Sequence, residues 1–162
     1  MVSGCGLLYP SAMRVLGVDF GRRRIGLALS DASATLARPW KTVAAGATPS
    51  ASAQLVARIV EAVREGREPE AEALDLIVVG VPRRLNGEDT DQTAPAQAFA
   101  AALETSCGVA VRSQDERLSS HEADRLLAVG ERDWRRRKAK LDAAAAAVIL
   151  QDYLDAHQRS QT

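Results

Sequence analysis

Three acidic side chains, far apart in the sequence, could together support metal-dependent chemistry. Asp19 interrupts the apolar run of residues 15–20, where an unpaired carboxylate would be costly. Glu116 follows a second apolar run, and Asp142 lies near the start of the last predicted helix. Carboxylate oxygens are preferred ligands of Mg²⁺ and Mn²⁺, and no cluster of histidines or cysteines competes for that role.

Asp19 has three alternative interpretations when it is taken alone. It could cap the following turn by bonding its own backbone, as Asp often does. Its spacing from Gly21 and Gly26 also occurs in the phosphate-binding turn of actin-like and sugar kinases. The third alternative is a metal ligand, and the choice depends on what the rest of the chain places beside it.

The elements that must position these acids follow from the hydrophobic pattern. Alternating or continuous apolar residues predict strands, and spacings of three and four predict helices. The predicted strands are 14–20, 25–30, 36–43, 74–81 and 109–113, and the predicted helices are 54–65, 94–103, 120–130 and 140–157. This β-β-β-α-β-α-β-α-α order predicts an α/β fold with a mixed five-stranded sheet and helices on both faces. Pro39 predicts an edge strand or a bulge for residues 36–43.

The topology predicts that the acids converge. Ligands of such sheets lie beyond the carboxyl ends of the parallel strands, where Asp19 and Glu116 are expected. Asp115 and Glu116 must face opposite ways on a strand, and we predict that Glu116 faces Asp19. Asp142 continues into the apolar stripe of Ala146, Ile149 and Tyr153, so it should point inward. The alternative is that Asp142 only complements the helix dipole.

Basic residues adjoin each acid, although the formal net charge is zero from 21 basic and 21 acidic residues. Most are arginines, which suit bidentate phosphate contacts. We predict that they bind a nucleic-acid backbone, while the alternative is an ordinary solvated surface. Trp134 could stack an unpaired base. The predicted nucleic-acid-binding residues are Arg22, Arg23, Arg24, Arg83, Arg84, Arg117, Arg135, Arg136, Arg137, Lys138 and Lys140.

The composition limits the protein's setting. Cys5 and Cys107 provide no disulfide framework, which predicts a reducing, cytoplasmic location. The longest apolar run, residues 143–150, is too short to span a membrane, and the N-terminus does not resemble a signal peptide. We predict a flexible leader at 1–12, a single domain at 13–157 and a tail at 158–162.

Four sequence motifs, spanning about Met13 to Leu154, resemble the YqgF/RuvX family. They are Asp19-Phe-Gly-Arg-Arg-Arg-Ile-Gly26, Gly80-Val-Pro82 with Asn86-Gly87, Asp115-Glu-Arg-Leu-Ser-Ser120, and Lys140-Leu-Asp142 with Ile149–Leu154. The resemblance implies a ribonuclease H-like fold and a nuclease that processes the 5′ end of pre-16S ribosomal RNA. It also implies that Asp19, Glu116 and Asp142 are catalytic and hold Mg²⁺ or Mn²⁺, with two ions expected and Asp19 bridging both.

Other functions stay open at this point. The family is related to Holliday junction resolvases, and a resolvase acting on branched DNA would require a two-fold homodimer. A non-catalytic RNA-binding factor in ribosome assembly would keep the fold without turnover. An actin-like phosphotransferase is disfavoured because the chain has no room for a second lobe. The chain departs from the family pattern at Gly80-Val-Pro82, where Gly-Leu-Pro is more usual, and at the bulkier Arg83-Arg84 that follow. These differences leave the substrate preference open.

Overall fold

The computed structural model describes residues 13–116 and 134–160, and within the second range it describes side chains for residues 140–158. The elements follow one another as β1 (Arg14–Phe20), β2 (Arg24–Ser30), β3 (Ala37–Ala44), α1 (Pro49–Arg64), the short 3-10 helix η2 (Pro69–Ala71), β4 (Leu74–Pro82), α2 (Thr93–Ser106), β5 (Ala110–Glu116) and α4 (Trp134–Ser160).

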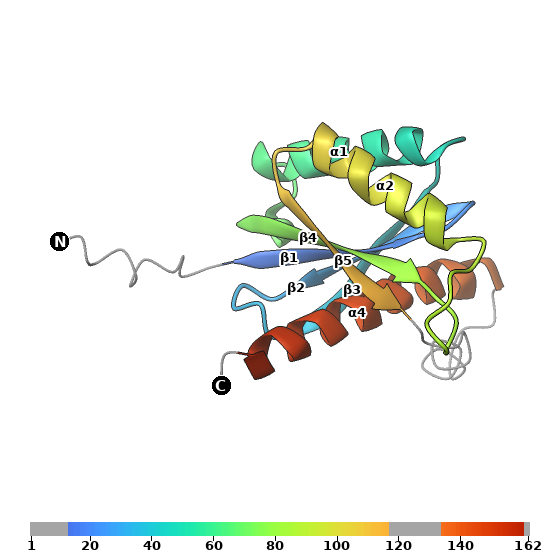
Figure 1. Cartoon of the computed structure of the whole chain (residues 1–162). Helices are drawn as coiled ribbons and strands as arrows, with labels where there is room; N and C mark the ends of the chain where they lie inside the picture. Colours follow the sequence, from blue (N-terminus) through green and yellow to red (C-terminus); the bar gives the residue numbers. More distant parts are fainter. Residues whose placement is uncertain (1–12, 117–133, 161–162) are drawn as a thin grey trace.

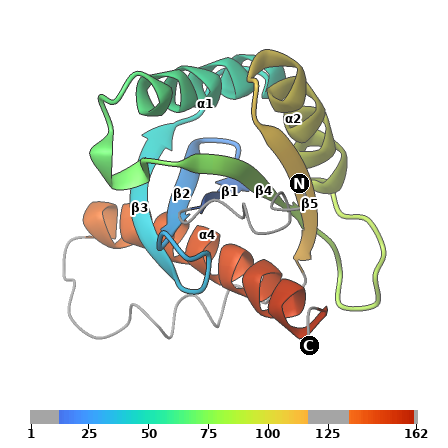
Figure 2. The same cartoon turned by 90° about the vertical axis from the view of Figure 1, so that its left-hand side faces the viewer.

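The five strands form one mixed sheet in the order β3-β2-β1-β4-β5. β2 is antiparallel to both β1 and β3, while β1, β4 and β5 are parallel. Helices α1 and α2 cover one face and α4 crosses the other (Figures 1 and 2). This confirms the predicted α/β architecture, which is the ribonuclease H-like arrangement expected from the resemblance.

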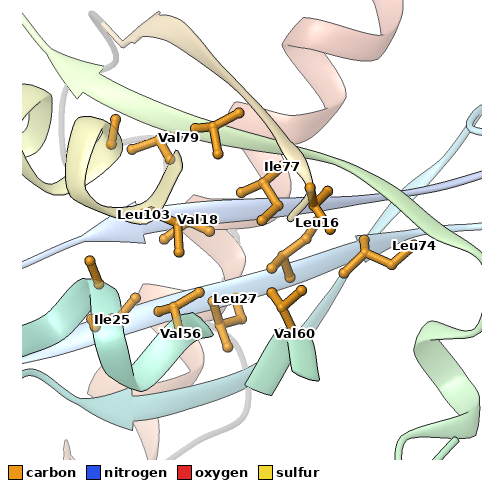
Figure 3. Close-up of a cluster of buried hydrophobic side chains, with 14 of the residues drawn as sticks. Leu16, Val18, Ile25, Leu27, Val56, Val60, Leu74, Ile77, Val79 and Leu103 are labelled. Carbon is orange, nitrogen blue, oxygen red and sulfur yellow. The ribbon is translucent and has the colours of Figure 1, made fainter. Parts of the chain in front are cut away.

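The larger core lies between the sheet and the pair α1 and α2. Alternate residues of the strands point to this side, as a two-residue period requires. Figure 3 shows these side chains meeting apolar residues of the two helices. The labelled members are Leu16, Val18, Ile25, Leu27, Val56, Val60, Leu74, Ile77, Val79 and Leu103, all of them buried.

Helix α4 packs unusually close to the opposite face of the sheet. Three strand glycines face it, and a Cβ at Gly17 or Gly80 would lie 2.7 Å from Leu150 Cβ or 2.5 Å from Ile149 Cδ1. A Cβ at Gly26 would overlap the backbone carbonyl oxygen of Asp142. The absence of these side chains therefore sets the distance and position of α4 over the sheet.

Some element boundaries differ from the prediction. α1 begins at Pro49, because Thr48 caps it by accepting a hydrogen bond from the Ala51 amide (3.0 Å). α4 begins at Trp134 and ends at Ser160, so it includes the basic segment and part of the predicted tail. Arg, Lys and Ala are good helix formers, which explains why the helix extends through the basic segment and does not begin at residue 140. The predicted leader at 1–12 and helix at 120–130 lie outside the described residues.

Strand β3 forms one edge of the sheet, as Pro39 predicted. The register passes from Leu27 opposite Lys41 to Ala28 opposite Pro39, which leaves Trp40 as the bulged residue. The Gln151 side chain of α4 accepts a hydrogen bond from the Ala37 amide (2.8 Å) and thereby covers part of this edge. Among the described residues, no helix is long and apolar enough to cross a membrane.

Candidate active site

Asp19 lies on the face of the sheet that α4 covers. Gly17, two residues earlier on β1, packs against Leu150, so Asp19 points to the same side. Its cross-strand partner is Gly26 of β2, the glycine against which the backbone of Asp142 packs. The sheet register and the close packing of α4 thus bring the first and third acids to one place.

Glu116 is the last residue of β5 and faces the same side as Asp19. It is in register with Pro82, and Gly80, two residues before Pro82, packs on Ile149 of α4. The strand order places β4 between β1 and β5, so Glu116 starts roughly 10 Å from Asp19 across the sheet. One oxygen of Glu116, Oε2, is shielded from solvent.

Asp115 faces the other side, as its alternation with Glu116 predicted. Its carboxylate accepts a hydrogen bond from Arg83 Nε at 3.1 Å, and Arg83 also pairs with Asp89. The Arg83 amide donates to the Glu116 carbonyl at 3.0 Å, so the residue fixes the end of β5. The structure therefore places Glu116, and not Asp115, on the side of the sheet that Asp19 faces.

Asp142 lies more than two turns into α4, because the helix begins at Trp134. The helix-dipole alternative applied to the first turn and no longer explains this residue. As predicted, the stripe below it packs inward, with Ala146 and Ile149 buried. Asp142 Oδ2 accepts a hydrogen bond from Arg24 Nε at 2.7 Å, forming an ion pair between side chains that are about a quarter to a third exposed.

The three acids affect one another electrostatically. Burial, followed by the charges of Asp142 and Glu116, raises the pKa of Asp19 to about 7. The residue as a whole is only partly buried, so the pKa shift reflects the surroundings of its carboxyl group. Around neutral pH, a cation beside Asp19 would therefore favour its ionised form.

The chemistry of these donors fits a hard divalent cation, since all three are carboxylates and the charges of Asp142 and Glu116 raise the pKa of Asp19. Their geometry is less complete. Within residues 13–116 and 140–158, no three Asp, Glu, His or Cys side chains are already gathered closely enough to hold one ion. The Arg24 guanidinium occupies one side of Asp142 instead.

The predicted basic residues fall into separate groups. Arg22, Arg23, Arg84 and Lys140 are exposed. Arg24 and Arg83 form ion pairs with carboxylates. Arg117 and the side chains of Arg135, Arg136, Arg137 and Lys138 lie outside the described side chains, although residues 135–138 form the first turns of α4.

The environment of Asp19 also bears on its alternative interpretations. Among the described residues, its carboxylate accepts no hydrogen bond from the turn that follows; that turn is closed by Gly21 N donating to Arg24 O at 3.0 Å. A turn-capping role is therefore not supported. Sequence reasoning missed that Gly26 is required for the approach of Asp142, and that Arg24 pairs with Asp142. Three strand glycines on one sheet face were the available signal for the first.

The sequence matches one family of known proteins. A protein of Anaeromyxobacter dehalogenans strain 2CP-1, named "Putative pre-16S rRNA nuclease", is 41% identical over 143 residues, which cover 88% of this chain and 97% of that protein. A protein of Pelotomaculum thermopropionicum with the same name is 34% identical over 147 residues, covering 91% and 90%. The structure of T. thermophilus RuvC in complex with a Holliday junction substrate has a TM-score of 0.46 and 18% identity, covering 90% of this chain and 96% of that one. The family model described as "RuvX: Holliday junction resolvase" matches residues 13–156, and the chain therefore belongs to the RuvX family.

Proposed function

We propose that this protein is a divalent-metal-dependent nuclease that hydrolyses phosphodiester bonds at the 5′ end of pre-16S ribosomal RNA in the cytoplasm. The observation that carries the proposal is the convergence of Asp19, Glu116 and Asp142 on one face of the sheet, where the latter two raise the pKa of the first. The names of the relatives supply the RNA substrate.

Asp19, Glu116 and Asp142 would hold Mg²⁺ or Mn²⁺. Two such ions, when bound, activate the attacking water and neutralise the leaving oxygen. Asp19 lies on β1, in the middle of the sheet. On one side of β1 is β2, which packs against Asp142, and on the other side is β4, which neighbours the strand of Glu116. From this central position, Asp19 would be able to hold a metal ion together with either of the other two acids. The enclosing protein keeps water away from its carboxyl group and strengthens its interaction with cations.

A pocket beside Asp142 supports a contact with nucleic acid. It has a volume of about 420 Å³ and lies between β3 and α4, and its lining includes Lys140 and Ala143, which are within two residues of Asp142 in the sequence. Trp40 and Lys41 line its other side, and Lys41 Nζ lies 4.2 Å from the centre of the Trp40 ring. Apolar walls beside cationic groups are typical of sites that hold an unpaired base next to its phosphate.

The decisive test is cleavage of a pre-16S RNA fragment and of a four-way DNA junction, each with Mg²⁺, Mn²⁺ or EDTA. We expect metal-dependent cleavage of the RNA by the native protein and none by Asp19→Asn, which should still fold and bind RNA. Asp75→Asn provides a matched control, because Asp75 is exposed near the amino end of β4. Unchanged cleavage by Asp19→Asn would remove the nuclease assignment from this site.

The family description favours a second candidate, a resolvase that cuts branched DNA. Symmetric cleavage of the junction, together with a dimer in solution, would support it over the RNA nuclease. RNA binding with no cleavage of either substrate in any metal would instead support a non-catalytic assembly factor.

A further inference from the structure

An arginine occupies the site where the proposed function requires a metal ion. Arg24 starts β2, two residues before Gly26, and faces the same side as Gly26. Its Nε donates to Asp142 Oδ2 at 2.7 Å across 118 residues of sequence. The side chains of Arg24 and Asp142 are 31% and 25% exposed, so the ion pair is only partly screened by solvent.

The neighbouring arginines provide a comparison. Arg22 and Arg23 precede Arg24 in the same hairpin, and both are exposed. Arg22 and Arg23 lie in the turn before β2, whereas Arg24 is the first residue of the strand and faces the side of the sheet that α4 covers. Its contact with Asp142 is therefore set by the sheet and not by a general attraction between the hairpin and α4.

This rests on the proposed function: we propose that Arg24 is a positioning residue that takes the place of a cation in the metal-free site, and that Asp142 exchanges the Arg24 guanidinium for the metal on loading. The Arg24 guanidinium and a metal ion are both positive, and the Asp142 Oδ2 atom cannot accept the hydrogen bond from Arg24 and bind the ion in the same position.

Two consequences follow from this competition. Without metal, Arg24 offsets the repulsion between Asp142 and the enclosed Asp19, so its removal should destabilise the metal-free protein. With metal, Arg24 must be displaced, so its removal should strengthen metal binding. Removing a residue that only stabilises the fold, or that only orients a bound ligand, would not lower the stability without metal and at the same time strengthen metal binding.

The test is calorimetric titration of the full chain with MnCl₂, combined with thermal unfolding in EDTA. We expect Arg24→Ala to bind Mn²⁺ about fivefold more tightly, which corresponds to about 1 kcal/mol for a partly exposed pair. Its unfolding temperature in EDTA should be lower than that of the native protein. Arg23→Ala removes the same charge from the same hairpin without the contact, and its Mn²⁺ affinity should stay within about twofold of the native value.

Weaker or unchanged Mn²⁺ binding by Arg24→Ala would overturn the inference. Should that variant fail to fold, Arg24→Gln keeps much of the side-chain length, and the Nε–H resonance of Arg24 in the native protein gives an independent measurement. That resonance should shift in step with Mg²⁺ binding, and an unmoved signal at saturation would also overturn the inference. Absence of Mn²⁺ binding by the native protein would instead contradict the proposed metal site itself.

Discussion

Replacing Asp19 by Asn should stabilise the metal-free protein at alkaline pH, although it removes the central residue of the proposed site. The carboxyl group of Asp19 is enclosed, and its neighbours Asp142 and Glu116 are also acidic. These conditions raise its pKa from 3.8 to about 7 in the folded protein. The amide of Asn has similar size but carries no charge, so it avoids the cost of ionising Asp19 in this environment.

The sign and size of this stability change follow from the linkage between protonation of Asp19 and folding. The folded state binds the Asp19 proton more tightly than the unfolded state. This contribution to stability is fully present below about pH 4 and is lost as pH rises to about 7. At about 1.4 kcal/mol per pKa unit, the whole range corresponds to about 4 kcal/mol. For a protein of this size, each kcal/mol changes the unfolding temperature by about 2–4 °C.

Thermal unfolding in EDTA at about pH 5 and about pH 8 would measure the effect. About two pKa units of this range fall between pH 5 and pH 8, so we expect the unfolding temperature of Asp19→Asn, relative to the native protein, to be higher at pH 8 than at pH 5 by roughly 5–10 °C. Added Mg²⁺ should then stabilise the native protein and reduce the difference, because a ligand that binds only the folded state shifts the equilibrium.

The matched variant is Asp75→Asn, which removes an exposed carboxylate from the opposite end of the parallel strands. It should show little change in relative stability between the two pH values. An Asp19→Asn variant that is equally or less stable than the native protein at pH 8 would refute the reasoning, since it would mean that Asp19 is not electrostatically strained.

Three further predictions concern the placement of the site. Gly26→Ala should displace α4 and lower the free energy of unfolding by roughly 1–3 kcal/mol or more, because its Cβ would overlap the Asp142 carbonyl. The unfolding temperature and the Mn²⁺ affinity should both fall, and an unaffected Mn²⁺ affinity would contradict the role of this glycine. Glu116→Gln should abolish metal-dependent cleavage while Asp115→Asn leaves it largely intact, since the two carboxylates face opposite sides of the sheet; equal losses in a cleavage assay would argue against this assignment. Replacing residues 135–137 by Ala should weaken RNA binding and flatten its dependence on salt, as measured by binding titrations, and an unaltered salt slope would exclude this segment from the interface.

The parts of the fold that could be predicted were those with a local signal. The apolar runs of β1 and β4 and the alternation in β2 identified strands that the structure contains. Alternation also separated Glu116 from Asp115 without any knowledge of their partners. Pro39 identified β3 as an edge strand because proline cannot donate to a sheet ladder.

The remaining features depend on contacts between distant residues. The pairing of Arg24 with Asp142 joins side chains 118 positions apart, and nothing within the Arg22–Arg24 run distinguishes the third arginine until the strand is placed. The role of Gly26 likewise appears only when α4 lies against it. The start of α4 was missed because a run of basic residues resembles a solvated loop, although its helix propensity is high.

The irregular edge at β3 limits how two copies of this protein could associate. Pro39 offers no amide hydrogen, Trp40 interrupts the ladder, and Gln151 already accepts from the Ala37 amide. An incoming strand would find few regularly spaced donors there, so joining two sheets into one continuous ribbon through this edge is unfavourable. A symmetric pair that cuts both arms of a junction would have to be built through another surface.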